Sequence, residues 1–221
     1  MFFRKDYAAP GPGIDPNEPE KTGLARFLEI LSLECGTLLK LNLLFLLCSL
    51  PVVTLPPVLY AMHCVVRKMI LDQPVDCFYD FKAALRKHWR RGYAAFFLVA
   101  LPLVLSGFGV WFYLGRALAG PLFFLPFMLC STVFLVTLLA SPYFYGFLTT
   151  KPTVKEALRL SVLLGVGRPA RALLAVLSVY GTLTIAILEF PISAVYLLFI
   201  GFSIPCLLGN FFIRTILIQF E

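Results

Sequence analysis

The sequence predicts an all-α fold: a polytopic helical membrane protein with about five transmembrane helices and amphipathic helices at the membrane surface. Of its 221 residues, 60% are apolar and 14% are charged, whereas soluble domains average about 45–50% apolar and about 25% charged residues. Long runs contain no charged side chain at all, which is typical of membrane-spanning helices; they include 41–66, 117–150 and 190–213. This composition excludes an ordinary soluble enzyme.

The chain divides into a tail and one helical domain. Residues 1–22 are expected to form a disordered tail, because they combine acidic residues with four prolines and lack the apolar segment of a signal peptide. Residues 23–221 are expected to form a single helical membrane domain. It begins with an amphipathic helix over 23–36, where apolar residues recur at helical spacing.

The first uncharged run, 41–66, contains 26 residues, which is enough for one crossing of about 20 residues but too few for two. Prolines interrupt its middle, so it forms either one strongly kinked span or two half-helices that re-enter on the same side. We favour the single crossing. The residues of this possible kink or substrate region are Asn42, Pro51, Thr54, Pro56 and Pro57.

Four further spans follow, and basic segments separate them into pairs. The predicted spans are about 93–114, 122–147, 172–188 and 192–213. Short connections join the members of each pair, over 115–121 and 189–191. The segments before each pair contain amphipathic helices, which are predicted over 76–91 and 153–164 from the helical spacing of their apolar residues.

The distribution of charge indicates the orientation. Segment 67–91 carries seven Lys or Arg residues and segment 151–171 carries five, whereas the connection over 115–121 holds only Arg116. Because basic residues are retained on the cytoplasmic side, both segments and the C-terminus are expected inside. A single crossing over 41–66 then places the N-terminus outside, and a re-entrant segment places it inside.

Nothing in the sequence indicates catalysis. It contains no known catalytic motif and no Cys or His residues at metal-ligand spacing, so we expect a non-enzymatic protein without catalytic residues, metal or cofactor. Nucleic-acid binding is not implied, because membrane topology already accounts for the basic residues. We expect His63 at the membrane interface and Glu189 in an aqueous turn, with Asn42 and Asn210 forming hydrogen bonds between helices.

The basic amphipathic helices are the candidate interaction surface. Clustered Lys and Arg residues at a membrane attract anionic lipid headgroups, and they can equally bind an acidic surface of a membrane protein. The residues expected to bind a partner or lipid headgroups are Lys82, Arg86, Lys87, Arg90, Arg91, Lys155 and Arg159.

The stretch NLLFLLCSLPVVTLPP over 42–57, with VVRK over 65–68 and the aromatic and basic segment 78–90, resembles the opening of the YesL-like family of bacterial integral membrane proteins. The resemblance implies a multi-pass protein of the bacterial plasma membrane. The biochemical function of that family is unassigned, but its genomic association implies a link with carbohydrate uptake and with transporter permeases. It supplies no catalytic residues.

The expected function is therefore an accessory or assembly component of a bacterial carbohydrate-uptake system, embedded in the lipid bilayer and bound to a transporter permease or another membrane protein. One alternative is a small solute transporter with its site at the broken first segment. Another is a lipid-binding membrane scaffold. Each of the three is compatible with an oligomer.

Overall fold

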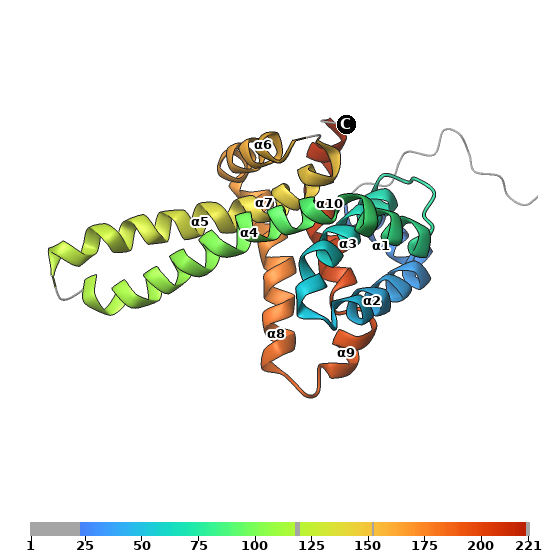
Figure 1. Cartoon of the computed structure of the whole chain (residues 1–221), viewed down its shortest axis with the longest axis horizontal. Coiled ribbons are helices and arrows are strands. Elements are labelled where there is room, and N and C mark those ends of the chain that lie inside the picture. Colours follow the sequence, from blue (N-terminus) through green and yellow to red (C-terminus); the bar gives the residue numbers. More distant parts are fainter. Residues whose placement is uncertain (1–22, 118–119, 152, 220–221) are drawn as a thin grey trace, which may run out of the picture.

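The computed structural model describes residues 23–117, 120–151 and 153–219, so the predicted tail over 1–22 lies outside the described residues (Figure 1). The described residues are helical and include no β-strand, which confirms the predicted all-α class. In chain order the elements are α1 (Leu24–Leu33), α2 (Cys35–Ser49), the 3₁₀-helix η1 (Val52–Thr54), α3 (Leu55–Ile70), α4 (Cys77–Ala117), α5 (Pro121–Thr150), α6 (Val154–Gly167), α7 (Pro169–Val176), the π-helix η2 (Leu177–Gly181), α8 (Thr182–Leu188), α9 (Ala194–Phe199) and α10 (Ser203–Gln219).

Helices α4 and α5 form a long hairpin that projects from the other helices (Figure 1). Glycines allow the two helices to approach closely, because a Cβ at Gly109 would lie 2.5 Å from the Cys130 sulfur. The projecting half exposes large apolar side chains on both helices, as lipid-facing helices do; they include Leu105, Phe108, Trp111, Leu125 and Leu129.

Three of the predicted spans correspond to helices that are long and apolar enough to cross a membrane. Spans 93–114 and 122–147 lie in α4 and α5, and span 172–188 lies in the continuous segment formed by α7, η2 and α8. A fourth candidate arises if α1 and α2, bent by 72°, count as one broken span. The predicted surface helix 76–91 is not separate from span 93–114: both belong to α4, which bends at His88.

The predicted span 41–66 is not one continuous helix: it is divided between two helices, α2 and α3, that contact each other. Helix α2 ends at Ser49, and η1 leads into α3, whose first turn accommodates Pro56 and Pro57. The two helices have 15 and 16 residues, or about 22–24 Å each at 1.5 Å per residue. Each is too short for a hydrocarbon core of about 30 Å.

An ion-pair cluster holds the two ends of this helical hairpin together. The Arg26 guanidinium of α1 pairs with Glu29 at 2.6 Å and also with Asp72, in the turn after α3. Arg214 of α10 lies 3.7 Å from the same Asp72 carboxylate. Residues before α2 and after α3 therefore lie close together, an arrangement that favours the re-entrant alternative.

The predicted span 192–213 is also broken. It consists of the short helix α9 and the longer α10, with a break over 200–202. Helix α10 lies at the centre of the molecule, in contact with α2, α3, α5 and α7. The predicted surface helix 153–164 is confirmed as α6, and its Thr153 side chain accepts a hydrogen bond from the Glu156 amide at the first turn.

The side of the membrane at which the α2–α3 hairpin begins can be measured with Cys35, which is exposed. One variant retains Cys35 as its single cysteine, and a second carries only the cysteine introduced by Lys82→Cys. A membrane-impermeant maleimide is expected to label these two variants under the same conditions, because both positions lie on the same side of the membrane. A cysteine introduced by Arg116→Cys, in the last turn of α4, is expected to show the opposite accessibility in intact protoplasts. Labelling of Cys35 together with position 116 would contradict the re-entrant hairpin.

Candidate functional site

Asn42 forms hydrogen bonds with the backbone on both sides of the break between α9 and α10. Its side chain is completely buried in α2. The amide nitrogen donates to the carbonyls of Leu197 and Leu198 at 3.0 and 2.8 Å, and the amide oxygen accepts from the backbone N–H groups of Phe202 and Ser203 at 2.9 and 3.1 Å. The predicted hydrogen bonding of Asn42 between helices is therefore confirmed, and its amide has no bonding capacity left for a substrate.

The other residues of the predicted kink or substrate region form a packed turn. The Thr54 hydroxyl donates to the carbonyls of Cys48 and Pro51. Pro56 and Pro57 are buried against Gly92 of α4, where a Cβ would lie 2.5 Å from the Pro57 Cα. This close contact packs the start of α3 tightly against α4.

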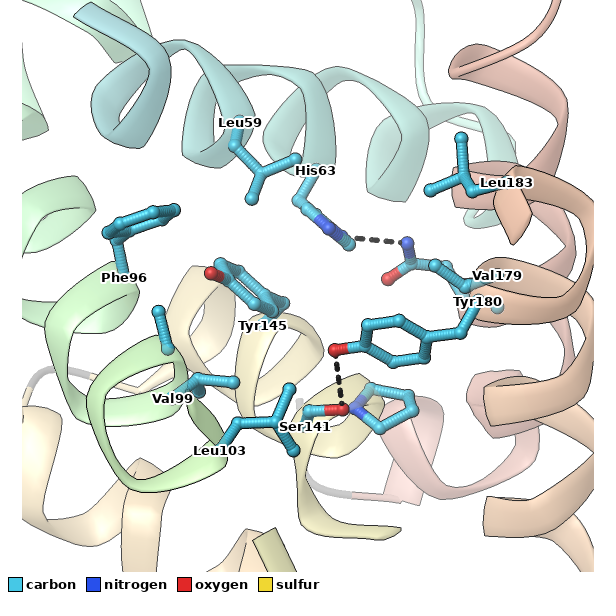
Figure 2. A pocket seen from close by; sticks show the side chains of 14 residues that line it. Leu59, His63, Phe96, Val99, Leu103, Ser141, Tyr145, Val179, Tyr180 and Leu183 are labelled. Carbon is cyan, nitrogen blue, oxygen red and sulfur yellow. Dashed lines mark hydrogen bonds between the residues drawn. The ribbon is translucent and has the colours of Figure 1, made fainter. Parts of the chain in front are cut away.

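A cavity of about 260 Å³ lies one to two turns further along α3 (Figure 2). Five segments line it: α3, α4, α5, the η2–α8 segment and α10. Its wall is mainly apolar, which is typical of pockets for small molecules. The apolar lining residues are Leu59, Phe96, Val99, Ala100, Leu103, Pro142, Val179 and Leu183.

His63 and Asn210 form the polar centre of this cavity. The Asn210 amide nitrogen lies 2.9 Å from His63 Nδ1 and donates to the Cys206 carbonyl at 2.8 Å. The His63 ring stacks on Tyr145, with ring centroids 4.8 Å apart. The predicted interhelical bond of Asn210 is confirmed, whereas the expected interfacial position of His63 is wrong: its ring turns inward toward α10.

A π-helix and a proline-containing helix line the same cavity. The π-helix η2 contributes Val179 and Tyr180 to the wall, and α5 contributes Pro142, a proline within a continuous helix. The Tyr180 hydroxyl donates to Ser141 at 3.1 Å (Figure 2). Single π-turns within α-helices are frequent at functional sites. No signal in the sequence pointed to this π-helix.

The predicted basic surface lies on other parts of α4 and α6. The exposed members are Lys82, Arg86, Lys87, Arg90, Lys155 and Arg159. Arg91 differs because it is half-buried and its guanidinium donates to the Lys151 carbonyl at 3.4 Å. Burial, together with the positive charges of Arg91 and Lys87, lowers the pKa of His88, which favours its neutral form.

Other basic residues of the same segments serve the fold. Lys68 pairs with Asp80 at 2.7 Å, and Arg67 donates to the Thr149 carbonyl at the end of α5 at 2.9 Å.

Glu189 is exposed in the turn after α8, as expected for an aqueous turn. Across the described ranges, no three His, Cys, Asp or Glu side chains gather as a metal site requires.

Comparison with known proteins supports the resemblance in the sequence. Residues 38–110, from α2 to α4, match a family described as "Protein of unknown function, DUF624". YesL-like proteins belong to this family, so the predicted resemblance is confirmed over these residues. No curated protein and no solved structure matches the chain.

Asn42→Leu is expected to lower the free energy of unfolding by about 2–4 kcal/mol, because it leaves buried backbone groups without partners. Unfolding of the purified protein in mixed micelles measures the change. Thr132→Val is the matched control, since it removes only a local bond to the Met128 carbonyl on an exposed helix face. Equal stability of the two variants would show that the Asn42 bonds do not hold the α9–α10 break.

Proposed function

We propose that this protein is a non-enzymatic accessory or assembly component of a carbohydrate-uptake system in the bacterial plasma membrane. The observation that carries the proposal is the exposed basic surface of α4, formed by Lys82, Arg86, Lys87 and Arg90. None of these four side chains forms an ion pair with another described residue. Their charge is therefore free to bind an acidic partner.

The basic surface supports a cytoplasmic position for this end of the molecule, because Lys and Arg residues are retained on that side. The Arg26–Asp72 ion pair brings α1 to the same end, and Arg214 brings the end of α10 there. We therefore propose that both ends of the helical domain face the cytoplasm. This proposal replaces the expected outside location of the N-terminus.

An acidic cytoplasmic surface of a transporter permease is the partner that best complements this charge. The long side chains stand on a helix whose opposite face is anchored by buried Phe81 and Ala84. A rigid helix holds the four charges in one arrangement, which favours a specific partner. The link with carbohydrate uptake itself rests on the resemblance to the YesL-like family.

Anionic lipid is the second candidate partner, because exposed aromatic residues flank the basic ones. Phe78, Tyr79 and Trp89 are all exposed, and the Arg90 guanidinium lies 5.3 Å from the Trp89 ring centroid. Aromatic and basic side chains together are typical of the membrane interface. A scaffold that binds only lipid would use the same residues.

The test changes Lys82, Arg86, Lys87 and Arg90 together to Gln, with Gln73→Lys and Pro74→Lys added to maintain the charge bias of the segment. Arg91 is retained because it bonds the end of α5. We expect recovery of a stoichiometric permease with the affinity-purified protein to fall at least about tenfold, as the loss of several charge pairs predicts. Quantitative mass spectrometry of crosslinked native membranes measures the recovery.

The matched control changes Lys155 and Arg159 of α6 to Gln, which removes charge from the neighbouring helix. We expect it to retain most of the permease. Undiminished recovery with the quadruple variant would contradict the docking proposal. Loss of binding to phosphatidylglycerol vesicles, with no stoichiometric protein partner in either sample, would assign the surface to lipid instead.

A further inference from the structure

We propose that the cavity between α3, α4, α5, α8 and α10 is a binding site for a small, membrane-dissolved apolar alcohol of about ten non-hydrogen atoms. This inference is independent of the docking function, which uses a different surface. It rests on the cavity's size, its apolar wall and one unpartnered acceptor atom at its polar centre.

The acceptor is the side-chain oxygen of Asn210. Asn210 is 2% exposed, and its Oδ1 atom has no hydrogen-bond partner among the described residues. The orientation of the amide follows from its neighbours: the Cys206 carbonyl, 2.8 Å away, requires an N–H group to face it. The second N–H then faces His63 Nδ1, and the oxygen remains free for a ligand.

Tyr180, Ser141 and the His63 Nδ1 atom, which also belong to the cavity, already have hydrogen-bond partners. The Tyr180 hydroxyl donates to Ser141, and the Ser141 hydroxyl donates to the Leu138 carbonyl at 2.8 Å. The His63 Nδ1 atom accepts from Asn210. A buried acceptor without a partner is costly. A ligand that donates one hydrogen bond to Asn210 therefore binds more tightly than an otherwise similar ligand without a donor.

The wall and volume limit the rest of the ligand. A cavity of about 260 Å³ exceeds the roughly 150 Å³ that suffices for benzene in an engineered apolar cavity, so a ring or short chain with a hydroxyl group fits. A free sugar does not fit this chemistry, because most of its hydroxyls would lose water against apolar side chains without gaining a partner.

The surroundings of the cavity indicate how the ligand arrives. Leu103, Val179 and Leu183 line it and are partly exposed on helices long and apolar enough to cross a membrane. Figure 2 shows Tyr180 and Leu183 on the segment opposite Leu59 and His63 of α3. A ligand dissolved in the bilayer therefore reaches the site between these segments without passing through water.

The test compares 2-phenylethanol with the nearly isosteric n-propylbenzene, using the full chain in lipid nanodiscs. Saturable binding is measured by ligand-detected NMR, with empty nanodiscs subtracted. We expect the alcohol to bind about tenfold more tightly than the hydrocarbon, because only the alcohol donates to Asn210. Equal affinities, or no saturable binding of the alcohol, would overturn the proposal.

Two variants locate the binding. Asn210→Leu is expected to abolish the preference for the alcohol, and Ala100→Phe, which fills the cavity but keeps its polar groups, is expected to abolish binding of both probes. Ala83→Phe, on an exposed face of the same helix, is the matched control and should bind normally. If Asn210→Leu does not fold, Ala100→Phe still decides: unchanged binding in that variant would overturn the proposal.

Discussion

The fold depends on satisfying the backbone where helices break inside an apolar molecule. A helix end leaves N–H and C=O groups without partners, and lipid offers none. Asn42 supplies both kinds of partner at once, since its amide binds two carbonyls at the end of α9 and two N–H groups at the start of α10. Without this contact, α10 could not begin at the centre of the bundle.

The same constraint explains the N-terminal part of the molecule. Pro51 ends the helical path of the first apolar segment, and Thr54 binds the carbonyls that the turn exposes. The returning helix α3 then brings Asp72 back to Arg26 and Arg214. Ion pairs therefore join the two ends of the α2–α3 hairpin. Its helix α2 places Asn42 against α9 and α10, and its helix α3 places His63 against Asn210.

The cavity and the basic surface are separate consequences of this arrangement. The cavity lies beside the π-helix η2 and Pro142 of α5, and its apolar wall surrounds the polar pair of His63 and Asn210. In the part of α4 before the bend at His88, the basic side chains are exposed, whereas Phe81 on the opposite face is buried in the core. The apolar pocket and the charged face therefore lie on different parts of the molecule, and the two proposed binding roles do not depend on each other.

The sequence by itself determined the helical class, the α4, α5 and α7–α8 candidate spans, the amphipathic helices and the basic segments, because hydropathy, helical spacing and charge are local properties of the chain. Tertiary structure decided the division of the first apolar segment into α2 and α3, the break before α10 and the cavity. These features depend on contacts between residues far apart, such as Asn42 with Phe202 and His63 with Asn210. An isolated polar residue in an apolar run indicates a hydrogen bond, but only the packed helices determine which group it meets.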